Sequence, residues 1–469
     1  MKKSGVGSQE LGVRREAEGL WLKAEEKQRK SFNLQPSAFS RIFILLLTAY
    51  CLLFTVVHAE EKTITLTDAS RLAIAGYESV KLSEEDLRQA DIAIDKAISQ
   101  MLPTITVDGN YTKYSESETS GGFNTQPDSN SSLNVKLSQS LYSGGKEWSL
   151  WRQAKKNTES SKHKLDATKE EIILNVSKIY YNVLKAGKTV EIKEAALKRA
   201  MEQRRVATSR FQVGEVTKAI VLRAEAEVAG AEAEYSTAKK DLLVARDKLA
   251  RFLSISEDFK VADPNIQTVP DASLDKLVSL SLEKRQDYMQ SELGEEIADE
   301  AINYAVGNFL PSLKLEGVYS KRDQDPKTTF FNEESIYAGL TLTYPIFEGG
   351  LRKAELNEAK SKKRQAEFKR ASLKKDIEIE VKEAFHNLEA YNSIIESFKR
   401  QLSFARENYT MVFKQFTYGL TTNVDVIDAN TTLVSSERNL ANTQYDYQVA
   451  ILELKKRVGV LLEDMVTGK

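Results

Sequence analysis

Two acidic side chains at helical spacing are the most suggestive chemical groups in this chain. Asp425 and Asp428 lie three positions apart in the segment Val424-Asp-Val-Ile-Asp428, and on a helix this spacing places both carboxylates on one face. Carboxylates gathered at one place favour cations and are costly to crowd without counterions. The same residues also suit a simpler interpretation, in which they are two solvated acids on a helix surface.

Residue types used for catalysis and metal binding are scarce. The 469-residue chain has three histidines and a single cysteine, Cys51. His163 and His386 each fall inside a long predicted helix, without a nucleophile motif or the spacing of a metal site. One cysteine supports neither a disulfide framework nor a thiolate metal centre. We therefore expect no enzyme, no cofactor and no metal site.

The composition narrows the class of protein. The chain has 67 basic and 68 acidic residues, and its mean hydropathy is −0.41. A chain this polar is not a bundle of membrane-spanning helices, each of which needs about 20 apolar residues. A net charge near zero also gives no general reason to bind nucleic acid.

One strongly apolar run, residues 42–57, follows Arg41 and ends in Val57-His58-Ala59. It is short for a membrane span and carries its basic side at the N-terminal end, which is typical of a secretory signal peptide. We therefore interpret residues 1–59 as an N-terminal extension and signal peptide, with an uncleaved inner-membrane anchor as the alternative.

The rest of the chain contains two copies of one unit. Landmarks recur 205 positions apart: Gly144-Gly145 returns as Gly349-Gly350, and Gly214 returns as Gly419. Leu102-Pro103 returns as Leu310-Pro311, 208 positions later. A register held over so long a stretch predicts an internal duplication. We divide the exported chain into a first repeat, residues 60–260, and a second repeat with its linker, residues 261–469.

Each copy is predicted to hold two strands, a very long helix and shorter helices. Apolar and polar residues alternate with period two, which predicts strands at about 105–112, 133–141, 313–319 and 336–344. The proline-free stretches Lys146–Gln212 and Leu351–Thr417 predict helices about 100 Å long. Shorter helices are predicted at Thr67–Met101, Thr217–Ser254, Ser281–Phe309 and Thr422–Leu462. The predicted fold class is α+β, mainly α.

Four strands cannot close a membrane barrel, because bacterial outer-membrane barrels begin at eight strands and leave no edge open. These strands nevertheless have the apolar and polar faces of barrel strands, with their long loops at one end. The deficit is resolved if several chains contribute four strands each, although the pattern does not decide between two chains and three. A small soluble sheet capping a coiled coil is the alternative.

These landmarks resemble the TolC family of outer-membrane efflux and secretion channels, over about residues 62–462. The resemblance rests on the repeated Leu-Pro and Gly-Gly pairs and on the segment Gly419-Leu-Thr-Thr-Asn-Val-Asp-Val-Ile-Asp-Ala-Asn-Thr-Thr-Leu433. It implies a homotrimer in the outer membrane of a Gram-negative bacterium. Its twelve-stranded barrel, with four strands per chain, would continue into a periplasmic α-helical barrel roughly 100 Å long.

The resemblance also implies partners. A family member works with a periplasmic adaptor and an inner-membrane pump, here of RND or ABC type, and its barrel contacts outer-membrane lipid. The competing hypothesis is a periplasmic coiled-coil adaptor or structural spacer protein. Such a protein would lack the paired strands and the twofold repeat.

The resemblance implies a channel constriction at the tip of the second copy, where acidic residues ring the periplasmic entrance. Asp425 and Asp428 match that motif. The first copy has Ile220 and Arg223 at the corresponding positions. We expect Arg223 to pair with Asp428 or a neighbouring acid.

That expectation arises because this chain lacks the residues that hold the tip closed in other family members. Family members hold the closed tip with a tyrosine and an arginine, and this chain has Phe416 and Thr421 at those positions. The resemblance further implies that adaptors dock on the tips, at Val213, Gly214, Glu215, Gly419, Leu420 and Thr421. Glu215 departs from the leucine that is usual there, and the glycines also suit plain helix C-caps.

The junction between strand and helix is the last predicted site. Gly144, Gly145, Gly349 and Gly350 would let the backbone turn from a tilted strand into a helix, because glycine meets no steric penalty there. Aromatic residues cluster at the same junction: Tyr142, Trp148, Trp151, Tyr344 and Phe347. They suit either anchoring at a membrane interface or simple packing.

Overall fold

A computed structural model describes residues 62–121, 123–256, 259–263, 272–327 and 331–467. The predicted N-terminal extension and signal peptide, residues 1–59, and part of the linker between the repeats lie outside the described residues. The fold is mainly helical with one larger antiparallel sheet, as predicted.

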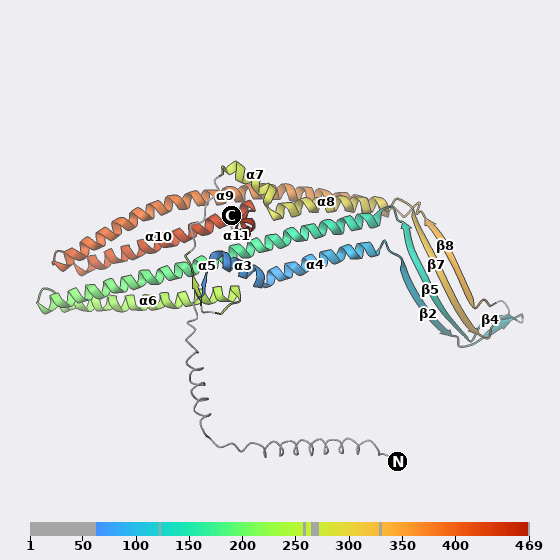
Figure 1. Ribbon diagram of the computed structural model, residues 1–469, viewed down its shortest axis with the longest axis horizontal. Coiled ribbons are helices and arrows are strands. Elements are labelled where there is room, and N and C mark those ends of the chain that lie inside the picture. Colours follow the sequence, from blue (N-terminus) through green and yellow to red (C-terminus); the bar gives the residue numbers. More distant parts are fainter. Residues whose placement is uncertain (1–61, 122, 257–258, 264–271, 328–330, 468–469) are drawn as a thin grey trace, which may run out of the picture. The chain divides into compact units, whose positions relative to one another are not determined.

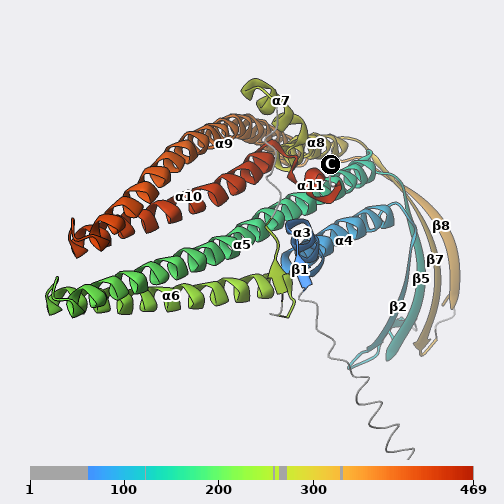
Figure 2. The same ribbon diagram turned by 60° about the vertical axis from the view of Figure 1, so that its left-hand side comes forward.

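Two helices of 67 residues dominate the fold, α5 (Lys146–Gln212) and α9 (Leu351–Thr417). Their predicted limits are confirmed. α6 (Lys218–Leu253) packs along α5, and α10 (Asn423–Val458) packs along α9 (Figures 1 and 2). Each pair forms an antiparallel hairpin with a tight turn, and α5 also contacts α10, so the two hairpins lie against each other.

The prediction of one helix over Thr67–Met101 is wrong. The segment forms α3 (Leu66–Gly76) and α4 (Glu78–Ser99), separated by Tyr77 with φ −78° and ψ 133°. The Tyr77 ring stacks on Phe252 of α6 with centroids 4.4 Å apart. This tertiary contact holds one residue extended inside a helical pattern.

The second repeat has the same break. α7 (Leu274–Lys284) and α8 (Gln286–Gly307) are separated by Arg285, with φ −68° and ψ 126°. The predicted helix Ser281–Phe309 therefore begins inside a different element. The predicted helix Thr422–Leu462 also divides, because α10 ends at Val458 with Gly459 as its C-cap, and a short helix, α11 (Leu461–Thr467), follows.

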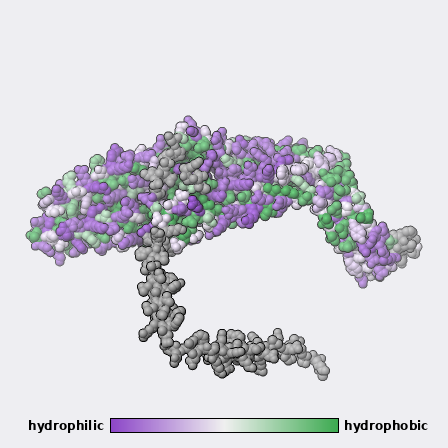
Figure 3. Space-filling model, viewed as in Figure 1, coloured by the Kyte–Doolittle hydropathy of each residue, from purple (hydrophilic) through white to green (hydrophobic). Residues whose placement is uncertain are grey.

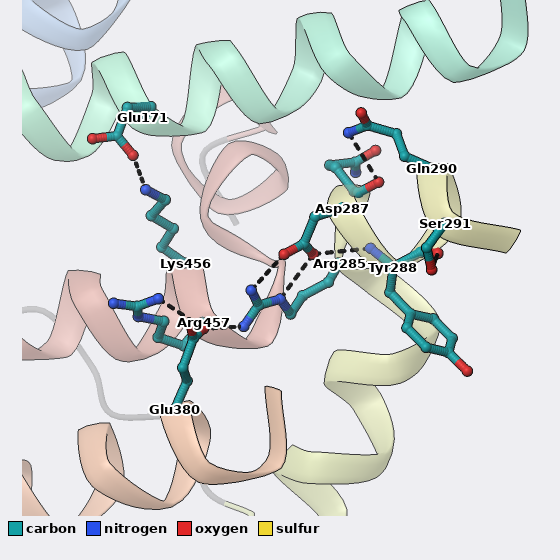
Figure 4. Close-up of polar contacts among 10 residues, drawn as sticks. Glu171, Arg285, Asp287, Tyr288, Gln290, Ser291, Glu380, Lys456 and Arg457 are labelled. Carbon is teal, nitrogen blue, oxygen red and sulfur yellow. Dashed lines mark hydrogen bonds and ion pairs between the residues drawn. The ribbon is translucent and has the colours of Figure 1, made fainter. Parts of the chain in front are cut away.

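Charged side chains hold the α7–α8 break against α9 and α10 (Figure 4). Arg285 donates 2.7 Å and 2.6 Å hydrogen bonds to Glu380 of α9 and Asp287 of α8. Arg457 of α10 donates to the same Glu380 at 2.7 Å. The Arg285 side chain is only 11% exposed, so its carboxylate partners offset the desolvation of a buried cation.

The four-stranded sheet has the order β2-β5-β7-β8 and is antiparallel throughout. Its strands are β2 (Thr104–Lys113), β5 (Ser129–Tyr142), β7 (Ser312–Asp325) and β8 (Glu334–Thr343). The two inner strands have 14 residues and the two outer strands have 10. All four predicted strands are thus present.

One face of this sheet is apolar across all four strands. The register places Ile105 opposite Leu137, and Leu315 opposite Leu340. Hydrophobic side chains gather over the strands in the space-filling view (Figure 3). Ile105 is 68% exposed and Leu340 is 62% exposed, an apolar surface that a folded chain does not leave in water without a use.

The first long loop, between β2 and β5, is not wholly irregular. Its Ser/Gly/Asn-rich composition is typical of an irregular loop, but it contains a small hairpin of β3 (Glu118–Ser120) and β4 (Phe123–Gln126). The hairpin is polar and short, so it carries no alternation of apolar residues that would reveal it.

The main core lies where α5 meets α3, α6 and α11. Tyr180 and Tyr181 of α5 are 0% and 1% exposed. The Tyr180 hydroxyl lies 3.0 Å from the carbonyl oxygen of Ile64 and 2.6 Å from that of Ala262. It thereby fixes β1 (Lys62–Ile64) and β6 (Phe259–Val261), which pair as a small separate sheet.

Candidate functional site: the helical tips

The two hairpins end in turns of the same geometry. The backbone N–H of Glu215 donates to the carbonyl of Arg210 at 2.9 Å, and that of Leu420 donates to Gln415 at 2.9 Å. Gly214 and Gly419, with φ +83° and +78°, occupy the left-handed position that ends each long helix. The hydrogen bonds are those of a Schellman cap, so local backbone chemistry fully explains the tip glycines.

The residues predicted to dock an adaptor are at these turns. Val213 and Leu420 are 71% and 77% exposed, and each projects an apolar side chain from a turn. The Glu215 carboxylate instead pairs with Arg210 at 3.0 Å. The Thr421 hydroxyl donates to Asp425 at 2.6 Å. Each tip therefore presents an exposed apolar residue beside a polar one.

Asp425 has a local structural role. One of its carboxylate oxygens accepts hydrogen bonds from the hydroxyls of Thr421 and Thr422 and from the backbone N–H of Thr422. With the Thr422 hydroxyl it completes a capping box at the start of α10. These hydrogen bonds lower the pKa of Asp425 to about 2, because they favour the ionised form. Asp425 therefore carries a firmly held negative charge at the tip.

Asp428 lies one turn further along α10 and is exposed. Within the described part of a single chain, its carboxylate has no hydrogen-bonding or ionic partner. Arg223 on α6 is also exposed and likewise has no ionic partner there. The expected pairing of Arg223 with Asp428 does not form within the described part of one chain.

The residue that joins the two tips is Arg210, which the sequence did not single out. Its guanidinium donates 2.8 Å to the carbonyl of Phe416, at the end of α9. It also lies 5.4 Å from the Phe416 ring centroid and pairs with Glu215. A Cβ atom on Gly419 would lie 2.9 Å from the guanidinium. Arg210 thus fills the space between the hairpins.

Two more side chains of α5 reach across to α10. Gln203 donates 2.6 Å to the side-chain oxygen of Asn423, and both residues are buried. Arg199 donates 2.7 Å to Asn430 and lies 3.4 Å from Glu437. We call Arg199, Gln203 and Arg210 the α5 clasp.

The spacing of the α5 clasp, four and seven residues, places its members on one side of the helix. Sequence periodicity predicts which face of α5 is buried, but not that a polar part of it meets α10, more than 200 residues away. The role of Asp425 could have been found, because Thr422-Asn-Val-Asp425 has the Thr-x-x-Asp spacing of a capping box.

The strand-to-helix glycines have the backbone angles expected of such a turn. Gly144 and Gly145 have φ +71° and +77°, and Gly349 and Gly350 have φ +61° and +88°. Gly144 is constrained further, since a Cβ atom there would lie 2.3 Å from the carbonyl oxygen of Gly307. This close approach joins the start of α5 to the end of α8.

The two histidines among the described residues lie outside any cluster. His163 contacts the side chain of Gln286 at 2.7 Å, and His386 is exposed beside Glu389. Across the described residues there is no group of three or more His, Cys, Asp or Glu side chains placed to hold a metal. Among these same residues, none of the helices combines the length and apolarity that crossing a membrane requires.

Comparison with known proteins identifies the family to which this chain belongs. The family model described as outer membrane efflux protein matches residues 70–254 and 277–460, one stretch in each repeat. Outer membrane protein TolC of Escherichia coli strain K12 is 26% identical over 408 residues, 82% of each chain. Alkaline protease secretion protein AprF of Pseudomonas aeruginosa is 21% identical over 355 residues, 74% of each chain.

Solved structures agree on the fold. The Campylobacter jejuni CmeC outer membrane channel superposes with a TM-score of 0.73 and 20% identity, over 84% of this chain and 86% of that chain. Because the family match spans the strand pairs and the long helices of both repeats, the hypothesis of an adaptor or spacer protein is not favoured. The chain therefore belongs to the outer membrane efflux protein family, and it is an outer-membrane channel protein with a large periplasmic helical portion.

Proposed function

We propose that three copies of this chain close into one duct, which conducts substrates passively from an inner-membrane pump across the periplasm and outer membrane. The observation that carries the proposal is the four-stranded sheet. Within the described residues, β2 and β8 each pair with one neighbour, so both edges are open. A closed barrel with an apolar outer face removes such edges, and three copies would supply twelve strands.

The helices support the same closure. α5 packs against α4, α6, α8 and α10, whereas α9 packs mainly against α7, α8 and α10 among the described elements. α4 and α6 therefore lie at one edge of the chain and α9 at the other. Both edges expose apolar side chains, with Leu243 of α6 57% exposed and Phe404 of α9 69% exposed. Head-to-tail contact between unlike edges generates a ring when the rotation between copies closes.

The constriction of this duct would lie at the α9–α10 tip. Asp425 and Asp428 of three copies would bring six carboxylates together, which favours cations and disfavours anions. Arg223 of a neighbouring copy is the cation available to pair with Asp428. Opening and closing at this tip would gate the duct, whose role is transport rather than catalysis.

The partners follow from this role. The exposed apolar residues Val213 and Leu420 suit docking of a periplasmic adaptor at the tips. The adaptor would connect the duct to an inner-membrane pump of RND or ABC type. The name of AprF refers to secretion of an alkaline protease, so protein export is one cargo class to test beside small molecules.

Cysteine cross-linking tests the closure directly. The exported chain should contain no cysteine, because Cys51 lies in the predicted signal peptide. A panel of pairs with one cysteine on β2, such as Val107→Cys, and one on β8, such as Leu340→Cys, should cross-link copies to each other. Denaturing gels should show cross-linked species of two and three chains, and none larger.

Single-cysteine variants are the matched controls, since a head-to-tail contact needs both edges. Cross-linked species that end at two chains would reject the trimer, and dimers formed by single-cysteine variants would reject head-to-tail closure. Planar-bilayer recording of the same preparation tests conduction. A stable cross-linked trimer without conductance would reject the duct.

A further inference from the structure

The first strand-to-helix junction contains a small cavity of about 290 Å³. We call its lining residues Ser140, Tyr142, Ser143, Glu147 and Trp148 the junction cup. Trp148 is 57% exposed and Tyr142 is 46% exposed, so two aromatic side chains flank a carboxylate at an open site. This combination is the chemistry that recognises an organic ammonium group.

The carboxylate of Glu147 is held in place but not neutralised. It accepts hydrogen bonds from the Ser143 hydroxyl and, at 3.1 Å, from the Ser140 hydroxyl. It lies in the first turn of α5, yet no side-chain hydrogen bond caps that helix. Throughout the described residues no lysine, arginine or histidine forms an ion pair with it. Its negative charge therefore remains available to a ligand.

The second strand-to-helix junction contains a cation that the first junction lacks among the described residues. At an offset of 205, Ser143 corresponds to Glu348 and Glu147 corresponds to Arg352. Arg352 pairs with Glu348 at 2.9 Å and lies 5.4 Å from the ring centroid of Phe309. The second repeat thus supplies an aromatic ring, a carboxylate and a cation from its own chain, whereas the first repeat supplies only the ring and the carboxylate.

The position of the cup indicates the source of the cation. Leu141 and Tyr142 are 51% and 46% exposed, and a register shift in β5 places Tyr142 opposite Leu313, on the apolar face of the sheet. The cup therefore lies where the apolar face ends and the periplasmic helices begin. In a barrel this is the level of the lipid headgroups.

From these observations we infer that the junction cup binds the primary ammonium of a phosphatidylethanolamine headgroup from the periplasmic leaflet. The ammonium would donate hydrogen bonds to Glu147 and lie against the Trp148 indole. The inference rests on the proposed function for its membrane position. Phosphatidylglycerol has no cation to offer, and phosphatidylcholine has a cation that cannot donate hydrogen bonds.

Lipid binding to the delipidated trimer, followed by native mass spectrometry, tests the inference. The probes are dioleoyl phosphatidylethanolamine, phosphatidylcholine and phosphatidylglycerol, which share the same acyl chains. We expect about tenfold tighter binding of the ethanolamine lipid than of the glycerol lipid. Glu147→Gln should abolish this preference without changing glycerol-lipid binding, and Trp148→Leu should reduce it.

Glu348→Gln is the matched control, because it makes the same change at the junction where Arg352 already supplies the cation. It should keep the preference. Equal binding of the two lipids by the unmodified trimer would overturn the inference, as would a preference that survives Glu147→Gln. Loss of the preference in Glu348→Gln would also overturn it, by revealing an effect of overall charge.

Two further measurements distinguish other occupants of the cup. Displacement of the lipid by soluble glycerophosphoethanolamine at equal concentration would indicate a site for soluble amines. Carbodiimide coupling of Glu147 to a lysine of a second copy would show that the neighbouring chain fills the cup. Either result rejects the lipid. A trimer that conducts without lipid preference would reject the cup alone, whereas failure to form a trimer would reject the proposed function.

Discussion

The guanidinium of Arg210 donates a 2.8 Å hydrogen bond to the carbonyl oxygen of Phe416, and so joins the end of α5 to the end of α9. The two helices belong to different repeats. Because Gln203 and Arg199 reach α10 from the same helix, the hairpins of one chain are held together at three levels. We infer that opening at the tip moves the two hairpins of a chain as a unit, with separation between chains.

Removal of this link should separate the tips. Arg210→Ala loses the hydrogen bond, the ion pair with Glu215 and the contact with the Phe416 ring. Spin labels at Val213→Cys and Leu420→Cys, in trimers diluted with unlabelled chain, should report a longer and broader distance distribution. Arg205→Ala is the control, because the ion pair that Arg205 forms among the described residues is with Glu202 of its own helix. An unchanged distribution in Arg210→Ala would show that the remaining clasp residues suffice.

The two tip carboxylates should respond differently to substitution. Asp425→Asn should weaken both cation selectivity and thermal stability, because Asp425 also caps α10. Asp428→Asn should weaken selectivity alone. Reversal potentials in a salt gradient measure the first property, and the midpoint of thermal unfolding measures the second. Selectivity that is unchanged in the double variant would place the constriction elsewhere along the duct.

The pH dependence of the tip has a definite sign. The folded-state pKa of Asp425 is about 2, below its ordinary value of 3.8. Its stabilising effect is therefore complete above about pH 4 and is lost as the pH falls toward 2. At pH 5–8 Asp425 therefore stays charged, so the loss of cation selectivity and of thermal stability in Asp425→Asn should be the same at pH 5 and at pH 8.

A buried acid in the main core should make the protein less stable as the pH rises. Glu170 is 5% exposed, and burial raises its pKa from 4.5 to about 7. Since the folded state holds its proton more tightly, stability falls between about pH 4.5 and 7, by on the order of 3 kcal/mol. Glu170→Gln should raise the unfolding midpoint at pH 8 and leave it nearly unchanged at pH 4.5.

Glu171 provides the matched control for this prediction. Its hydrogen bond to Lys456 lowers its pKa (Figure 4). Glu171→Gln should therefore lower the midpoint at pH 8, the opposite direction. Equal effects of the two substitutions would show that Glu170 is not held neutral.

Matched positions at the ends of the returning helices should also respond in opposite directions. Gly459 has φ +82°, and a Cβ atom there would lie 2.7 Å from the carbonyl carbon of Lys284. Ser254, 205 positions earlier, already carries a Cβ atom in the same left-handed region, with φ +54°. Gly459→Ala should destabilise by about 2 kcal/mol or more, and Ser254→Gly should stabilise by about 1 kcal/mol. Unfolding midpoints that move in the same direction would contradict this.

The sequence predicts the parts of this fold that depend on local chemistry. The limits of α5 and α9 follow from glycine at both ends and the absence of proline between them. The strands follow from alternation. The breaks at Tyr77 and Arg285 were not predicted, because each depends on a partner brought close only by folding, the Phe252 ring in one case and Glu380 in the other.

The candidate site likewise has some features that the sequence could predict and others that it could not. The tip turns and their glycines could be predicted, and the capping role of Asp425 was available in the spacing of Thr422 and Asp425. The α5 clasp could not be predicted, since its partners lie on the other repeat and a lone arginine among many basic residues carries no signal. The expectation for Arg223 and Asp428 remains a prediction about contact between copies.

Equal lengths of α5 and α9, and of α6 and α10, restrict how this chain can evolve. Deleting seven residues from α5 alone would shorten it by about 10 Å, which would carry Arg210 out of reach of Phe416 and leave one tip above the other. A change in the length of these helices therefore has to occur in both repeats before it is tolerated. Insertions and deletions should accumulate instead in the loops between strands, where the two copies already differ by three positions.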